Sequence, residues 1–201
     1  MSQIKMRLFT YFTGLNLKSF GISLIIRSQL GTDPWDALFV GLAHNVGFTV
    51  GTWLVFISVL ILFLNAYLTQ KKLNFVSFFS VFLLGLLTDL WLSVLRFDLH
   101  QIEYQMIFYW IGLFFLAVGV ATYIQGEFAM TPLDELMYGL ADRFNLSLMM
   151  SKTLTEIVAL VLAFLVQGPI GIGTVIFAFC FGPLIQFLIP KINAITRDVV
   201  D

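Results

Sequence analysis

The sequence predicts an all-α polytopic membrane protein, with six transmembrane helices arranged as two inverted three-helix repeats. Hydrophobic residues make up 59% of the 201 residues and charged residues 11%, and the mean hydropathy is +0.94. A typical soluble domain has roughly 25% charged residues, so lipid is the expected solvent. The stretch PWDALFVGLA at residues 34–43 returns as PLDELMYGLA at residues 132–141, a shift of 98 positions. Such a constant shift indicates internal duplication.

Six segments are long and apolar enough to cross a hydrocarbon core of about 30 Å. They are residues 8–28, 49–70, 75–96, 105–126, 147–167 and 171–190. Residues 34–47 and 132–145 are too short to span, and each begins with a proline that suits the first turn of a helix, so each predicts a short interfacial or re-entrant helix. Three crossings per half require the second half to enter from the opposite side, which is an inverted repeat.

We expect a single membrane domain over residues 1–201, with repeat 1 at about 7–98 and repeat 2 at about 105–195. Cytoplasmic loops of membrane proteins concentrate Lys and Arg, which tests the direction of the spans. With both termini in the cytoplasm, seven basic residues fall inside, leaving Arg27 and Arg96 outside. The seven are Lys5, Arg7, Lys71, Lys72, Arg143, Lys191 and Arg197. The expected location is therefore the plasma membrane, with cytoplasmic N- and C-termini.

Acidic and hydroxyl side chains surround the start of each short helix. Asp33 precedes Pro34, and Asp36 follows in the first turn, which is typical of an N-cap with an acidic residue that returns to it. Thr131 and Asp134 repeat this arrangement around Pro132. These residues could serve only as caps. Alternatively, a helix that begins inside a membrane protein directs free N–H groups at a cavity and can receive an anionic group of a substrate.

Ionisable residues also occur inside the predicted spans. Lys152 and Glu156 stand four residues apart in the fifth span, a spacing that permits an ion pair. Charges at the centre of a span cost about 2.5–3.5 kcal/mol on insertion scales, so they favour an interior or water-filled route. A neutralised structural pair near the end of the span is the alternative. Asp89 lies in the third span. Lys18 lies in the first span and has no acidic residue near it in the sequence, so we expect a partner from another segment. The candidates are Asp89, Glu156 and Asp36.

Glycines near the centres of the spans predict close contacts between helices, because lipid supplies no hydrophobic drive for helix association. These are Gly14, Gly21, Gly85, Gly112, Gly119, Gly173 and Gly182. The turn at residues 168–174 is expected to be tight and closely packed rather than a hinge. Cys180, the single cysteine, is expected to pack in an apolar run.

Several classes of function are not expected. The chain has a net charge of -1 and no cluster of basic residues, so we expect no binding to nucleic acid. The chain has two histidines and neither a His-Glu-x-x-His nor a Gly-x-Ser-x-Gly motif, so we expect no metal, no cofactor and no enzymatic activity.

The pattern of motifs resembles the YczE/YyaS/YitT family of bacterial membrane proteins, and it is most similar to the shorter YczE and YyaS branch. The residues that carry the resemblance are Arg7, Gly14, Gly21, the heptapeptide LGTDPWD at 30–36, Gly41-Leu42, Gly51, Gly173-Thr174 and Gly182. The resemblance implies a multi-spanning plasma-membrane protein, and export of small molecules has been suggested for some relatives. In the second copy Leu133 replaces the tryptophan and Ala129-Met130 replaces the Gly-Thr pair.

Inverted repeats, paired short helices and intramembrane charges are the parts that alternating access requires, so the sequence favours a secondary transporter or exporter of a small molecule. Coupling to an ion or a proton is compatible with these features. One alternative is a substrate-binding membrane subunit that works with separate ATPases, because the chain has no phosphate-binding loop. A second is a membrane scaffold for a biosynthetic complex. Assembly into a homo-oligomer is left open.

Overall fold

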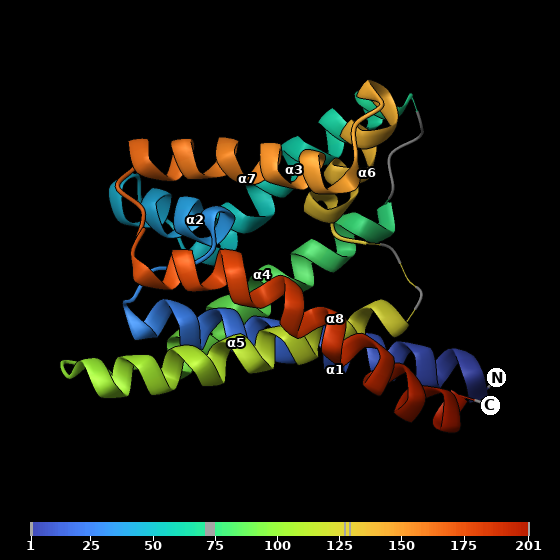
Figure 1. The fold of residues 1–201 in the computed structure, drawn as a ribbon, viewed down its shortest axis with the longest axis horizontal. Coiled ribbons are helices and arrows are strands. Elements are labelled where there is room, and N and C mark those ends of the chain that lie inside the picture. The colour runs from blue at the N-terminus through green and yellow to red at the C-terminus, as the bar shows by residue number, and fades with distance from the viewer. Residues whose placement is uncertain (1, 71–74, 127, 129, 201) are drawn as a thin grey trace. The chain divides into compact units, whose positions relative to one another are not determined.

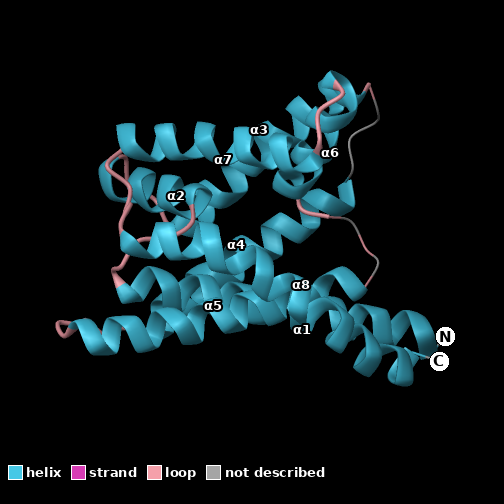
Figure 2. Cartoon of the chain, in the orientation of Figure 1, coloured by secondary structure: helices cyan, strands magenta, loops and turns pink. Residues whose placement is uncertain are grey.

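The computed structural model describes residues 2–70, 75–126, 128 and 130–200 of the chain, and every regular element in them is an α-helix (Figures 1 and 2). The helices are α1 (Ser2–Ser28), α2 (Pro34–Asn45), α3 (Val50–Thr69), α4 (Phe75–Val94), α5 (Ile102–Gln125), α6 (Pro132–Phe144), α7 (Leu148–Leu165) and α8 (Ile172–Val200). The two short helices predicted after Pro34 and Pro132 are present as α2 and α6.

Five helices are long and apolar enough to cross a membrane: α3, α4, α5, α7 and α8. They coincide with five of the predicted spans. Helix α1 has 27 residues, which is sufficient length, but it is not among the five. It is less apolar because Lys5, Arg7 and Lys18 lie along it.

Local sequence sets the ends of several helices. Thr49 and Ser147 are the N-caps of α3 and α7, and each side chain accepts a hydrogen bond from the backbone N–H three residues later. Such caps satisfy N–H groups that have no partner within the helix. The C-caps Gln70 and Asn145 adopt left-handed backbone conformations, with φ of 53° and 52°, and end α3 and α6.

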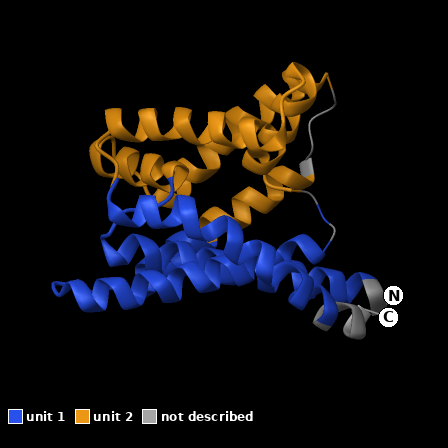
Figure 3. Cartoon of the chain, in the orientation of Figure 1, with its two compact units in different colours: residues 1–33, 87–128, 170–201 blue, residues 34–86, 129–169 orange. Residues whose placement is uncertain are grey.

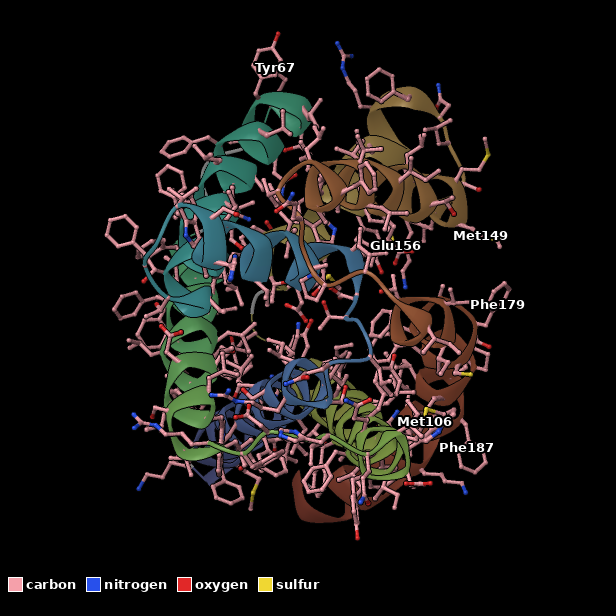
Figure 4. All side chains as sticks on the ribbon, turned by 90° about the vertical axis from the view of Figure 1, so that its left-hand side faces the viewer. Tyr67, Met106, Met149, Glu156, Phe179 and Phe187 are labelled. Carbon is pink, nitrogen blue, oxygen red and sulfur yellow. The ribbon has the colours of Figure 1, made fainter. Side chains whose placement is uncertain are left out.

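Large apolar side chains cover much of the exposed surface. Tyr67, Met149, Phe179 and Phe187 project away from their helices in Figure 4, and 74%, 82%, 75% and 57% of their respective surfaces are exposed. A soluble protein rarely leaves so many large apolar groups in water. The exposed surface therefore suits contact with lipid.

The chain divides into two compact units, which are coloured separately in Figure 3. Unit 1 contains residues 1–33, 87–128 and 170–201, and unit 2 contains residues 34–86 and 129–169. Each unit draws on both halves of the sequence. Neither unit therefore corresponds to one repeat.

In unit 1, α1 packs along α5, and α5 packs on α8. Tyr109 and Leu113 of α5 are fully buried in a cluster with Ile22 and Ile25 of α1 and Phe177 of α8. Cys180 packs against this cluster as a partly buried free thiol, in agreement with its expected packing role.

The contact between α1 and α5 depends on Gly14, Gly21, Gly112 and Gly119, which we call the glycine seam. The contacting pairs are Gly14 with Tyr123, Gly112 with Ile25, Gly21 with Leu116, and Gly119 with Lys18. Residue numbers rise along α1 as they fall along α5, so the helices are antiparallel. Shifting α1 residues forward and α5 residues back by 98 converts the first pair into the second and the third into the fourth.

In unit 2, α2 packs on α7 and α3, while α6 packs on α3 and α7. A Cβ atom on Gly168 would lie 2.8 Å from the carbonyl carbon of Ala37, so the turn after α7 is closely packed, as predicted. Gly85 of α4 is similarly close to the carbonyl oxygen of Gly51, at 2.8 Å. The prediction for Gly182 is wrong: a Cβ atom there would have no neighbour within 4 Å in the described part of the chain. Its position in a helix of high hydropathy does not by itself determine which helix face it occupies.

Candidate functional site

The turn that precedes α2 packs against the start of α8. The turn residues up to Asp33 and the start of α8 both belong to unit 1. Gly31 has a φ of +104°, a conformation that side-chain-bearing residues rarely adopt. The N–H of Gly173 donates to the carbonyl oxygen of Leu30 at 2.7 Å, and the hydroxyl of the fully buried Tyr109 donates to the carbonyl oxygen of Gly173 at 2.5 Å. Thr174 accepts a hydrogen bond from the N–H of Gly171 at 3.2 Å. The structure thus joins two sequence motifs that are about 140 residues apart.

Two of the predicted site residues flank the start of α2. Asp33 is half-buried and immediately precedes the helix, whereas Asp36 lies in its first turn with 8% of its surface exposed. An acidic residue in the first turn interacts favourably with the positive end of the helix dipole. The position of Asp36 therefore agrees with the capping interpretation and leaves the substrate-binding interpretation as a proposal.

The start of α6 has the predicted cap. The hydroxyl of Thr131, the N-cap, accepts from the backbone N–H of Asp134 at 3.4 Å and donates to the Oδ2 atom of Asp134 at 2.7 Å. Thr131 is buried and Asp134 is half-buried. The two predicted residues therefore form one hydrogen-bonded unit.

Three further polar residues surround this start, and the sequence analysis missed them. The Nδ2 atom of Asn65 on α3 donates to the carbonyl oxygen of Pro132 at 2.8 Å. The hydroxyl of Ser77 on α4 donates to the Oε1 atom of Glu135 at 2.6 Å. Asn65 is an amide in a strongly apolar helix, a signal that could have identified it. We refer to Asn65, Ser77, Thr131, Asp134 and Glu135 as the α6 polar cluster.

The predicted pair on α7 is formed. The Nζ atom of Lys152 lies 3.7 Å from the Oε1 atom of Glu156, and the two side chains are 50% and 33% exposed. Figure 4 labels Glu156 on this helix. The buried face of α7 consists instead of small residues, Ser151, Thr155, Ala159 and Ala163. The ion pair therefore lies beside the packed face of α7.

Lys18 has a different partner from those expected. Its Nζ atom lies 5.1 Å from the centroid of the Tyr123 ring, within the range of a cation–π interaction. In the part of the chain that the structure describes, Lys18 makes no ion pair with a carboxylate. Asp89, the predicted partner in the same unit, is half-buried on α4.

The structure therefore joins the predicted residues into two pairs, Thr131 with Asp134 and Lys152 with Glu156. Asp33 and Asp36 flank the start of α2, and Asp89 lies on α4. No group of three or more His, Cys, Asp or Glu side chains suited to a metal ion occurs among the described residues.

Apolar spanning helices, an apolar exposed surface and short polar-capped helices define a multi-pass α-helical membrane protein. The chain belongs to the family of unknown function DUF6198, whose model matches residues 5–190.

Three relatives match nearly the whole chain. It is 41% identical over 190 residues to the uncharacterized protein YyaS of Bacillus subtilis (strain 168), covering 94% of each chain. It is 29% identical over 182 residues to the uncharacterized membrane protein YczE of the same organism, covering 90% of this chain and 84% of the relative. An uncharacterized protein of Haemophilus influenzae is 30% identical over 183 residues, covering 91% and 82%. These matches confirm the predicted resemblance to the YczE and YyaS branch. No solved structure matches the chain significantly.

Proposed function

We propose that the protein is a secondary transporter or exporter of a small molecule, built from two inverted three-helix repeats. The observation that carries this proposal is the glycine seam between α1 and α5. Its contacts are reciprocal under the shift of 98 residues, and the two helices are antiparallel. A two-fold axis perpendicular to both helices accounts for this pattern. If α1 crosses the membrane in one direction, its copy α5 crosses in the other, as inverted-repeat transporters require.

The two short helices support the same proposal. Both α2 and α6 begin with a proline and carry an acidic residue in the first turn, and each packs on α3 and α7. In inverted-repeat transporters, helix termini within the membrane flank the substrate and the coupling ion. The proposed contacts are Asp33 and Asp36 at α2, and Thr131 and Asp134 at α6.

The intramembrane charges supply the second line of support. An ammonium at the centre of a span costs at least about 2.5–3.5 kcal/mol on insertion scales. The Tyr123 ring offsets only about 1–2 kcal/mol of this for Lys18. We therefore assign Lys18 a functional contact, with Asp89 and the Lys152–Glu156 pair as candidates for substrate or ion movement.

The proposal includes six spans with both termini in the cytoplasm. The seven-to-two distribution of Lys and Arg between the two sides supports this orientation. Helix α1 supplies the sixth span, because its 27 residues exceed the roughly 20 that a crossing needs. It packs along α5 within unit 1, and Ser23 and Arg27 on it donate to the carbonyl oxygens of Thr88 and Leu92 on α4.

The test combines a cell-based comparison with purified protein. Small molecules in cells and medium are compared by mass spectrometry between a deletion strain and the same strain that carries the gene. A compound whose distribution changes is then offered to proteoliposomes that contain only this chain. Gradient-driven or exchange transport without ATP supports the proposal. Transport that requires ATP and co-purified ATPase subunits supports the alternative of a substrate-binding subunit, and no transport of any compound contradicts both.

A further inference from the structure

The duplication provides an internal comparison for the α6 polar cluster. The N-caps Thr49 and Ser147 differ by 98 positions, so α3 and α7 start in the same register. Under this shift Asn65 of α3 corresponds to Ala163 of α7, and Glu135 of α6 corresponds to Ala37 of α2.

At the corresponding place in the contact between α2 and α7, the packing is apolar and tight. Ala37 and Ala163 are fully buried, and a Cβ atom on Gly168 would lie 3.3 Å from the carbonyl oxygen of Ala163. Two alanines therefore satisfy the packing of a short helix on a long one. The corresponding positions on α3 and α6 hold an amide and a carboxylate instead, although the packing does not require them; the amide donates to Pro132 of α6, and the carboxylate accepts from Ser77 of α4.

Asn65 is also incompletely bonded. Its Nδ2 atom donates to the carbonyl oxygen of Pro132, but its Oδ1 atom is buried and has no hydrogen-bond partner among the described residues, and only 5% of the residue is exposed. A Cβ atom on Gly139 would lie 3.9 Å from this Oδ1 atom, so the oxygen faces α6. Pro132, Glu135 and Gly139 lie on one face of that helix, at spacings of three and seven residues. The unpartnered oxygen is thus directed at the face that carries Glu135.

We propose that the α6 polar cluster binds a sodium ion. The cluster offers oxygen ligands, namely the Asn65 amide oxygen, the Ser77 and Thr131 hydroxyls, and the carboxylates of Asp134 and Glu135, and hydrogen bonds join Ser77 to Glu135 and Thr131 to Asp134. Hard cations prefer oxygen ligands. A bound cation supplies the partner that the Asn65 oxygen lacks and interacts favourably with the neighbouring carboxylates.

The arrangement favours a metal cation over a proton. A proton on one carboxylate serves a single donor–acceptor pair, whereas a metal ion coordinates several oxygens at once, including a neutral amide oxygen. Three of the five ligand groups are neutral, one amide and two hydroxyls, which suits a monovalent ion. The site deepens the proposed function by naming its coupling ion, but sodium binding is measurable whether or not transport occurs.

The experiment measures thermal unfolding of the purified full chain in detergent. NaCl replaces choline chloride at constant ionic strength and pH, and KCl serves as the control for another monovalent cation. We expect a saturable rise in Tm of about 5 °C with Na⁺, because a ligand that binds only the folded state stabilises it. Asn65→Ala and Glu135→Gln should each reduce this rise to less than half. Both variants should fold, since alanines occupy both corresponding positions in the other contact.

Asp142→Asn is the matched control, because it removes one charge from the exposed far end of the same helix. This variant should keep the full sodium response. An equal response to Na⁺, K⁺ and choline overturns the proposal, as does an unchanged sodium response in Asn65→Ala. A Tm that responds to pH but not to Na⁺ also overturns it and assigns the cluster to a proton. A flat sodium titration leaves the transport proposal standing, because that proposal is tested separately by solute movement.

Discussion

Replacing Gly21 by alanine tests the antiparallel contact between α1 and α5. A Cβ atom at this position would lie 2.6 Å from the carbonyl oxygen of Gly112, whereas an ordinary contact is 3.4–4 Å. It would also meet the backbone nitrogen of Leu116. Because both opposing groups are backbone atoms, no side-chain rotation relieves the clash, and the two helices must separate.

Two effects of opposite sign set the change in the free energy of unfolding that we expect for Gly21→Ala. Alanine is favoured over glycine within a helix by about 1 kcal/mol. Overpacking of a close contact costs about 1–3 kcal/mol, and a rigid backbone opposite places this site at the upper end. We therefore expect a net loss of about 2 kcal/mol in the free energy of unfolding, which corresponds to a fall in Tm of about 4–8 °C. The fall in Tm is measured by tryptophan fluorescence while the purified protein is heated in detergent.

The symmetric variant and a control make this prediction specific. A Cβ atom on Gly119 would lie 2.8 Å from the carbonyl oxygen of Gly14, so Gly119→Ala should lower Tm by a similar amount. Gly182 has no neighbour within 4 Å of its Cβ position, so Gly182→Ala should leave Tm unchanged or raise it. Wild-type stability of Gly21→Ala, or a loss in Gly182→Ala as large as in the seam variants, would refute the reasoning.

The remaining predictions address orientation, the short helices, the ion pair and the turn before α2. Reporter fusions should place residue 72 in the cytoplasm and residue 100 outside, and an external signal at residue 72 would contradict the orientation. Asp36→Asn should lower the free energy of unfolding by only about 0.3–1 kcal/mol, because it removes one charge from the first turn of α2, but should impair transport; normal transport would reduce Asp36 to a stabilising residue of the helix start. Glu156→Gln should abolish gradient-driven accumulation in proteoliposomes while substrate exchange partly remains, and equal accumulation would return the Lys152–Glu156 pair to a structural role. Tyr109→Phe removes a buried hydrogen bond to Gly173 and should lower the free energy of unfolding by about 1 kcal/mol, measured by the same thermal assay; an unchanged value would show that this bond is not stabilising.

Much of the local structure follows from the sequence. Hydropathy is a property of composition over some twenty residues, so the positions of the long helices could be predicted to within a few residues. The starts of α2 and α6 were readable because proline fixes its own backbone and hydroxyl or acidic side chains cap adjacent N–H groups. The duplication was also readable, because it is a relation between two stretches of sequence.

The candidate site could be predicted only in part. Thr131 with Asp134 and Lys152 with Glu156 are pairs within one helix, so a spacing of three or four residues was sufficient to identify them. Asn65 with Pro132 and Ser77 with Glu135 join different helices, separated by 67 and 58 positions, and no spacing rule connects them.

The sequence by itself determined the membrane class, the helices and the repeat, because these depend on composition and on short-range spacing. The tertiary structure decided which face of each helix is packed. It placed Gly21 and Gly119 in the seam but left Gly182 without a neighbour. It also showed that Lys18 faces an aromatic ring rather than a carboxylate in its own unit. These outcomes depend on the rotation and offset of one helix against another, which the whole set of packing contacts fixes together.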